Sequence, residues 1–174
     1  MKMITAGDIM IPLDKYPHIP HWFTLRQAMA EMEHAELEVG GRVSLPRAVL
    51  VFDEKYQLLG MVRRRDILRG LEPDFLTERS LDDRKKLFDF QAEPYLELVS
   101  FDEIMEGVYK RAERPVSEIM IPVKGTADYR DHIVKVVYEM NANRFSLLPV
   151  VKDGRVVGVV RTVDVFHEFA KMLL

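Results

Sequence analysis

Residues 8–12 read Asp-Ile-Met-Ile-Pro, and residues 118–122 read Glu-Ile-Met-Ile-Pro. Each copy of this pentapeptide opens on an acidic residue and is followed by segments of the same kind in the same order. Such self-similarity is the signature of a duplicated structural unit. The 174-residue chain is therefore predicted to contain two copies of one unit, each small enough to be marginal as a fold on its own.

An amphipathic helix is predicted after each pentapeptide. In the first copy, Thr24 and Gln27 have the three-residue spacing of a capping box. Apolar residues then recur at helical spacing in both copies. They are Leu25, Ala28, Met29 and Met32 in the first copy and Ile133, Val136, Val137 and Met140 in the second. Each helix thus presents one apolar stripe.

Two short apolar runs separated by a turn follow each helix and predict a hairpin of buried strands. The runs cover residues 48–52 and 58–62 in the first copy and residues 147–151 and 156–160 in the second. In the second copy the turn is Asp153-Gly154, the strongest short-range hairpin signal. Each copy then closes on an acid, Asp66 or Asp164, and a further apolar-periodic stretch that predicts a second helix.

The first copy contains an insertion. It is about a dozen residues longer than the second between its pentapeptide and its second strand. Gly40, Gly41 and Pro46 indicate that the extra residues form a loop at positions 39–47.

The stretch between the copies has apolar residues at helical spacing, which favours a structured connection over a flexible tether. We therefore expect unit 1 at residues 1–73, a helical linker at 74–113 and unit 2 at 114–174.

Composition excludes several classes of function. The chain is 48% hydrophobic and 30% charged, as expected of a globular protein, and its formal charge of −3 gives no broad basic face for nucleic acid or an anionic membrane. It contains no cysteine, so disulfides, thiolate metal sites and cysteine nucleophiles are excluded. There is no signal-peptide pattern and no apolar run long enough to span a bilayer. A cytoplasmic location is expected.

The order of these segments resembles the CBS domain, named after cystathionine β-synthase, and two in tandem resemble the Bateman module. The match is stronger in the second copy, where residues 148–151 read Leu-Pro-Val-Val and residues 158–160 read Gly-Val-Val. In the first copy Leu50 replaces the proline and Tyr56 the turn glycine. The resemblance implies an α/β (α+β) fold in which two β-α-β-β-α units pack sheet to sheet about a pseudo-twofold axis, leaving two clefts.

The resemblance also implies a ligand. In CBS pairs that bind adenosine compounds, an acid at the position of Asp66 and Asp164 holds the ribose hydroxyls, and a carboxylate can accept both. From the residues alone, an acid at the start of a helix most often satisfies the free amides of the first turn. The sequence leaves both interpretations open.

The family's hydroxyl residue, which meets phosphate, is replaced here by Arg63 and Arg161, with Thr162 one place late. Arginine offers several donors to an anion. Arg63 also begins a run of three arginines that ends at Arg65, at a helix start where a bound anion would offset unfavourable positive charge. Alternatively, the arginines fill the clefts or pair with surface acids.

The resemblance places further residues around the base of the ligand. They are Met10, Ile11, Pro12, Met120, Ile121, Pro122, Leu148 and Pro149. The alternative is that they belong to the core, because methionine commonly fills gaps in protein interiors.

Nothing in the sequence points to catalysis. There is no nucleophile elbow, no phosphate-binding glycine loop and no pair of acids flanking a cleft. His18 and His21 lie three apart, but Pro17 and Pro20 prevent the helix that would aim both at one metal.

The sequence therefore predicts a regulatory, energy-sensing module that binds AMP, ADP or ATP, with S-adenosylmethionine and NAD less favoured. We expect a homodimer that signals to a separate protein partner, with no enzymatic activity and no binding to nucleic acid or membrane. The alternative is an assembly module with empty clefts that acts through dimerisation or partner docking.

Overall fold

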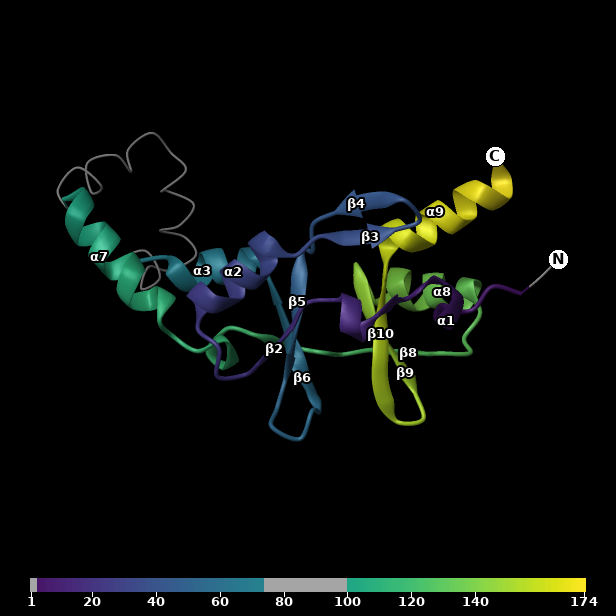
Figure 1. Ribbon diagram of the computed structural model, residues 1–174, viewed down its shortest axis with the longest axis horizontal. Coiled ribbons are helices and arrows are strands. Elements are labelled where there is room, and N and C mark those ends of the chain that lie inside the picture. The colour runs from purple at the N-terminus through teal and green to yellow at the C-terminus, as the bar shows by residue number, and fades with distance from the viewer. Residues whose placement is uncertain (1–2, 74–99) are drawn as a thin grey trace.

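The computed structural model describes residues 3–73 and 100–174 and contains two four-stranded sheets that face each other (Figure 1). Unit 1 contributes β2 (His18–Pro20), α2 (Leu25–His34), β5 (Ala48–Phe52), β6 (Leu58–Arg63) and α3 (Arg64–Leu71). Unit 2 contributes β8 (Ala127–Asp128), α8 (Ile133–Asn143), β9 (Leu147–Lys152), β10 (Arg155–Arg161) and α9 (Thr162–Leu173). The predicted helix, hairpin and second helix are thus present in both copies.

The repeated pentapeptides cross between the units. The end of the first forms β1 (Ile11–Pro12), which pairs with β10 of unit 2, and the end of the second forms β7 (Ile121–Pro122), which pairs with β6 of unit 1. The short helix α1 (Ala6–Ile9) likewise packs into the core of unit 2, and the 3₁₀ turn Val116–Glu118 contributes Val116 to the core of unit 1. Each unit is therefore completed by the opening segment of the other.

Matching backbone hydrogen bonds show that the two halves are structural equivalents. The amide of Arg64 donates to the carbonyl of Arg47 over 3.3 Å, and the amide of Thr162 donates to the carbonyl of Ser146 over 3.0 Å. These bonds join the start of the second helix to the residue before the first hairpin strand in each unit. The structure thus confirms the predicted pair of CBS-like units.

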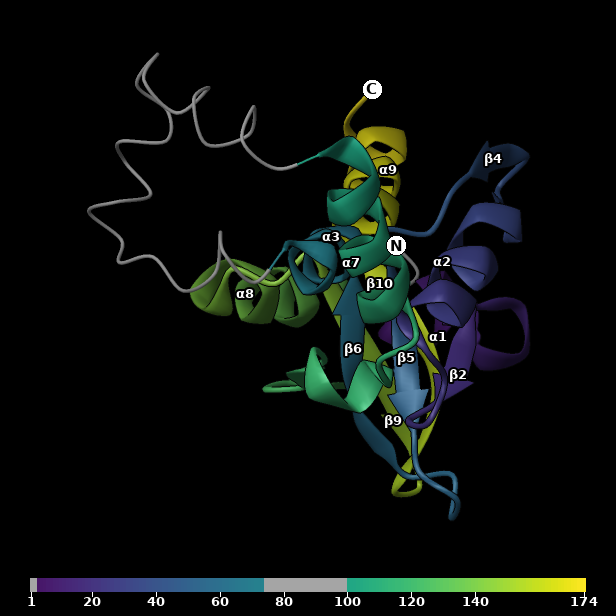
Figure 2. The same cartoon turned by 90° about the vertical axis from the view of Figure 1, so that its left-hand side faces the viewer.

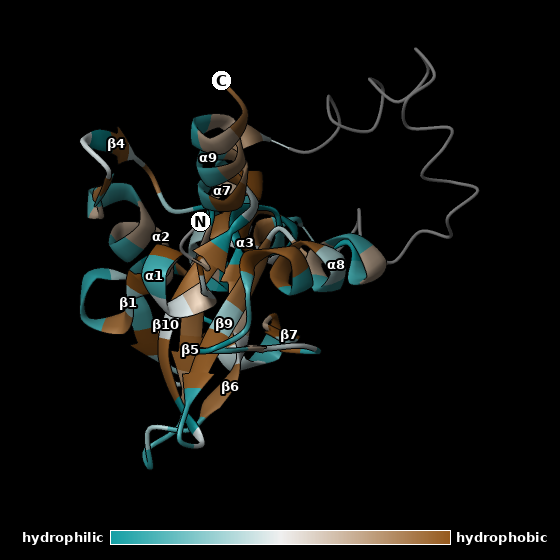
Figure 3. Ribbon diagram, turned by 90° about the vertical axis from the view of Figure 1, so that its right-hand side faces the viewer, coloured by the Kyte–Doolittle hydropathy of each residue, from teal (hydrophilic) through white to brown (hydrophobic). Residues whose placement is uncertain are grey.

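A central apolar cluster holds the two sheets together. It includes Leu50 and Phe52 from unit 1 and Leu147 and Val159 from unit 2, all buried. Figure 2 shows the strands of unit 1 in front of those of unit 2, and Figure 3 shows hydrophobic residues concentrated along these strands. Because one apolar sheet face covers the other, neither unit exposes its sheet to water.

The inserted segment of unit 1 differs from the loop we expected. It forms an antiparallel hairpin of β3 (Leu37–Val39) and β4 (Arg42–Ser44). Gly40 and Gly41 have φ values of +58° and +76°, the left-handed conformation that a tight two-residue hairpin turn requires at both central positions. The hairpin runs from the top of β5 toward α9 of unit 2 (Figure 1).

The predicted linker lies partly outside the described residues, which omit 74–99. Its last part forms α7 (Phe101–Ala112), which begins at a capping box between Ser100 and Glu103 and contacts α2 and α3. The chain then turns back to supply β7 to the sheet of unit 1.

Candidate nucleotide-binding clefts

One cleft opens between the two units beside Arg63 and has a volume of about 410 Å³. We call it the Arg63 cleft. Its walls come from the end of β6 and the start of α3 in unit 1, and from β7 with the following turn and the α8–β9 junction in unit 2. Its lining residues are Met61, Arg63, Arg65, Ile121, Pro122, Val123, Lys124, Gly125, Asn143, Arg144, Phe145, Ser146 and Leu147.

The lining of the Arg63 cleft combines cationic and apolar side chains. Among the described residues that line it, four are basic and none is a carboxylate. The basic residues are Arg63, Arg65, Lys124 and Arg144. Such a surface attracts an anion, and an apolar wall built from Ile121, Phe145 and Leu147 suits a flat, weakly polar group. The arrangement therefore suits a ligand that carries both.

Arg144 is held in a strained backbone conformation at the mouth of this cleft. It ends α8 with φ of +55°, a position usually occupied by glycine or asparagine, and a side chain there costs about 1 kcal/mol. Its guanidinium is exposed and lines the cleft. An unfavourable backbone conformation retained at a charged cleft points to a functional role.

Asp66 lies behind the Arg63 cleft and is not part of its lining. Its Oδ2 accepts from the Arg63 amide over 3.0 Å and from Nε over 2.8 Å, and its Oδ1 accepts from Nη2 over 2.9 Å. Burial by itself would raise the pKa of Asp66, but the hydrogen bonds from Arg63 outweigh it and lower the pKa. Asp66 thus caps the first turn of α3 as a buried carboxylate.

Asp164 repeats this arrangement with Arg161. Its two oxygens accept from Arg161 Nε over 2.8 Å and from Nη2 over 2.6 Å, and its Oδ2 also accepts from the Arg161 amide over 3.2 Å. In addition, Arg161 Nη1 donates to Ser44 Oγ of the inserted hairpin over 2.9 Å. The predicted acids therefore make the helix-capping contacts that the sequence allowed, each with the arginine three positions before it.

At the equivalent place beside Arg161, which we call the Arg161 cleft, side chains of unit 1 are buried. The Tyr16 side chain is buried, its hydroxyl donates to the Ala48 carbonyl over 2.6 Å, and burial raises the pKa of Tyr16. Leu37 of the hairpin is also buried there, in one cluster with Ile11 and Tyr16. Thr162 is exposed at the start of α9.

The structure distributes the other predicted ligand contacts between cleft and core. Ile121 and Pro122 line the Arg63 cleft, whereas Ile11 is buried beside Tyr16 and Pro12 is half-buried on β1. The remaining four pack into the interior of the units. They are Met10 and Leu148 in the cluster of unit 2, Met120 against the core of unit 1, and Pro149, buried within β9.

Sequence reasoning missed nine of the thirteen residues that line the Arg63 cleft. Lys124, Arg144 and Phe145 come from unit 2, whereas Arg63 comes from unit 1. The only signal for Lys124 was its place two residues after the second pentapeptide. Because β7 crosses to unit 1, motif residues of one copy meet flanking residues of the other.

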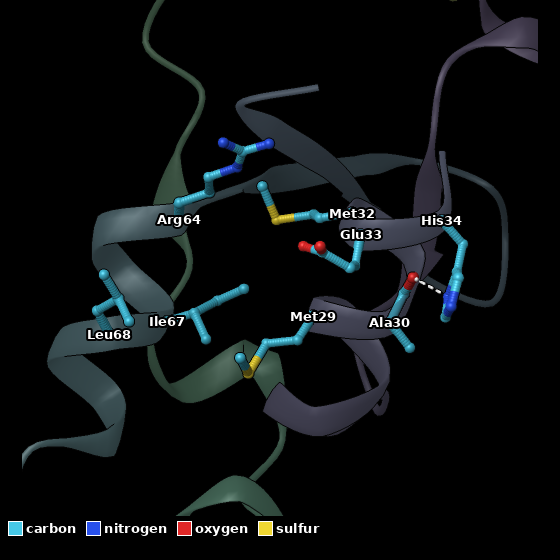
Figure 4. A pocket seen from close by; sticks show the side chains of 8 residues that line it. All are labelled: Met29, Ala30, Met32, Glu33, His34, Arg64, Ile67 and Leu68. Atoms are coloured by element: carbon cyan, nitrogen blue, oxygen red, sulfur yellow. Dashed lines mark hydrogen bonds between the residues drawn. The ribbon is translucent and has the colours of Figure 1, made fainter. Parts of the chain in front are cut away.

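A second hollow lies on the outer face of unit 1, between α2 and α3, with a volume of about 440 Å³. Figure 4 shows Met29, Met32 and Glu33 of α2 directed toward Ile67 of α3, with Arg64 of α3 above them. We call it the α2–α3 groove. Its floor is apolar, in contrast to the Arg63 cleft.

His18 and His21 bind different partners. His18 Nε2 lies 2.5 Å from the Tyr56 hydroxyl, and His21 Nε2 lies 2.9 Å from Glu54 Oε1. His132 is the N-cap of α8 and accepts from the Lys135 amide.

Comparison with known proteins gives a family and a fold. The family model described as CBS domain matches residues 6–73 and 116–171. No curated protein matches the sequence. In the part of the chain that the structure describes, no helix is both long and apolar enough to cross a membrane.

Several solved structures have the same fold. The CBS domain of a CBS-domain-containing membrane protein from Sphaerobacter thermophilus has a TM-score of 0.65 at 21% identity, covering 99% of this chain and 89% of that one. CBSX2 from Arabidopsis thaliana, a CBS-pair protein, has a TM-score of 0.65 at 16% identity, covering 98% and 97%. The cytosolic domain of the Mg²⁺ channel MgtE, in complex with ATP, has a TM-score of 0.58 at 21% identity, covering 95% and 48%.

Proposed function

Because the chain belongs to the CBS-domain family, we propose that it is a regulatory module that binds an adenine nucleotide (AMP, ADP or ATP) in the Arg63 cleft. The observation that carries this proposal is the lining of that cleft, where four basic side chains lie beside an apolar wall with no carboxylate among the described residues. The proposed role is binding rather than catalysis. A cytoplasmic location and a separate protein partner that reads the bound state remain predictions.

The two kinds of lining residue suit the two parts of a nucleotide. Lys124, Arg144 and Arg65 would bind the phosphates, because charge-assisted hydrogen bonds to phosphate are the strongest that side chains offer. The base would lie against the apolar wall formed by Ile121 and Phe145.

Arg63 and Asp66 would act together. Each oxygen of Asp66 now accepts from the Arg63 guanidinium, so a ribose hydroxyl would share a carboxylate oxygen with Arg63 or take its place. The Nη1 of Arg63 has no protein partner within the described residues and would be the first of its donors to meet a phosphate. Ligand binding would thereby change a contact at the start of α3, which is a route by which a partner could sense the ligand.

Two structural neighbours support an adenine nucleotide as the ligand class. A structure of CBSX2 is in complex with AMP, with a TM-score of 0.62 at 16% identity, and the MgtE cytosolic domain is in complex with ATP. Because both are less than 25% identical to this chain, the choice among AMP, ADP and ATP rests on experiment.

Titration with ATP tests the proposal. Lys124→Ala and Arg144→Ala are each expected to weaken ATP binding about fivefold to tenfold, since each removes one exposed cation from the phosphate site. The matched control is Lys15→Ala, an exposed cation in the segment that follows β1, the counterpart of β7. Isothermal titration calorimetry at two salt concentrations should show the control unchanged and wild-type affinity falling with salt.

Three results would contradict this assignment. They are no heat and no shift of the melting temperature with AMP, ADP or ATP, equal binding by all variants, or binding that salt does not affect. The first would favour the assembly module with empty clefts.

We further propose that the chain forms a homodimer through the outer helices. Leu68 on α3 and Phe166 on α9 occupy the same position in the two units, two residues after the capping acid, and are 62% and 74% exposed. The α2–α3 groove lies beside Leu68. A second copy of the chain, related by a twofold axis, could cover Leu68 with the α2–α3 groove and also cover Phe166. A single small ligand could not cover both places.

Replacement of either residue by glutamate tests the dimer. Leu68→Glu and Phe166→Glu are each expected to convert a dimer to monomers, because a buried unpaired carboxylate is costly at an apolar interface. Light scattering after size-exclusion chromatography measures the mass. Val43→Glu, on the equally exposed hairpin tip, is the control and should remain dimeric. A monomeric wild-type chain would refute the homodimer.

A further inference from the structure

We propose that the β3–β4 hairpin of unit 1 fills the Arg161 cleft. The duplicated fold offers two sites, but the chain then binds one nucleotide only, in the Arg63 cleft. The identity of the ligand in this inference rests on the proposed function, whereas the position of the hairpin does not depend on it. The hairpin makes the two units differ in function although their backbones are nearly symmetric.

The two clefts would be alike without additions to unit 1. Arg63 lies opposite Ala48 in the β5–β6 ladder, and Arg161 lies opposite Leu147 in the β9–β10 ladder. Both arginines hold a capping acid three positions later with the same donors. We attribute the difference in access between the clefts to segments that only one unit has.

Unit 1 has two such segments. One is the hairpin, placed between α2 and β5, where α8 and β9 of unit 2 are joined directly. The other is the connection after β1, in which six residues separate Pro12 from Ile19, whereas four separate Pro122 from the equivalent Ala127. The longer connection carries Tyr16, which is 2% exposed.

The base of the hairpin is part of the central core. Leu37, at the start of β3, is 1% exposed and packs in the cluster that contains Ile11, Tyr16 and Val159. Val39 packs against the same cluster. In the Arg63 cleft the counterpart of Ile11 is Ile121, which lines the open cavity. Apolar side chains of unit 1 thus fill the space that the adenine ring of a nucleotide would occupy in this cleft.

The second strand of the hairpin faces the Arg161 guanidinium at this same end, because Ser44 of β4 pairs with Leu37 of β3. Ser44 accepts the hydrogen bond from Arg161 Nη1, so Nε, Nη1 and Nη2 of this guanidinium all donate to protein oxygens. The Arg161 side chain is accordingly 12% exposed, against 30% for Arg63. A phosphate that took over the Nη1 contact of Arg161 would have to displace Ser44.

Native mass spectrometry with ATP tests the stoichiometry. The expected result is one ATP per chain at saturation. The Lys124→Ala/Arg144→Ala double variant is expected to bind no ATP at the same concentration. Two ATP per chain would overturn the proposal. No ATP at all would refute the proposed function instead, and the seating of the hairpin is then decided by a ligand-free measurement.

Thiol labelling provides that measurement, since the chain contains no cysteine. Ser44→Cys places a single thiol against Arg161, and the matched control Val43→Cys places one on the same strand at a side chain that is 65% exposed. A seated hairpin should make the thiol at position 44 react with a maleimide at least about tenfold more slowly than the thiol at position 43. Equal rates in the folded variants would overturn the proposal.

A third variant confirms that a slow rate reflects seating. Adding Leu37→Ser to the Ser44→Cys chain removes the apolar anchor of β3 and should raise the labelling rate toward that of Val43→Cys. Circular dichroism establishes that the variants fold. An unchanged slow rate would show that Leu37 does not hold the hairpin in the cleft.

Discussion

Gly158→Ala is expected to lower the free energy of unfolding by about 3 kcal/mol, the upper end of the usual cost of overpacking a core. A Cβ atom at this position would lie 2.5 Å from the backbone oxygen of Ile11 and 2.8 Å from the sulfur of Met10. Both belong to the segment that crosses from unit 1, and a backbone atom cannot move aside as a side chain can. Denaturation by urea, monitored by circular dichroism, measures the change.

The control for this prediction is Gly107→Ala. Gly107 lies within α7, and a Cβ atom there meets nothing within 4 Å. Because alanine favours a helix over glycine, this variant should be up to about 1 kcal/mol more stable. If Gly158→Ala were as stable as the wild type, the crossing of β1 onto the sheet of unit 2 would be wrong.

Asp66→Asn should cost about 2 kcal/mol, the second largest effect, since it leaves Arg63 partly buried without its carboxylate and weakens the cap of α3. The pKa of Asp66 is lower in the folded chain than its usual value, so the carboxylate contributes stability at pH values above about 4. That contribution is lost as the pH falls through the lowered pKa.

Measuring the urea midpoint from pH 7 to pH 3 separates this pair from other acids. The wild type should lose more stability than Asp66→Asn as the pH falls below about 4, so that the two curves approach each other. Glu106→Gln, an exposed position in α7, is the control and should follow the wild-type curve. Parallel curves for wild type and Asp66→Asn would contradict a charged pair.

The repeated unit could be predicted from sequence because its signals are local. The capping box at Thr24 and Gln27 starts α2 as expected. Asp153 and Gly154 have φ values of +50° and +76°, the tight turn that their identity predicts between β9 and β10. In these segments the residue pattern, the turn and the packing favour the same structure.

The crossing of β1 and β7 could not be predicted in this way. Ile11 and Ile121 carry the same local pattern, which fits an edge of either sheet equally well. Only packing of the whole chain selects the edge, and that choice places Lys124 of unit 2 beside Arg63 of unit 1. The inserted hairpin was missed for a related reason, since Gly40 and Gly41 suit an irregular loop as well as a tight turn.

A crystal structure of the protein grown with ATP tests the central claim most directly. We predict one nucleotide per chain in the Arg63 cleft, with its phosphates beside Lys124 and Arg144 and with Ser44 still bound to Arg161. Nucleotide density beside Arg161 with the hairpin displaced, or an Arg63 cleft that stays empty at saturating ATP, would contradict it.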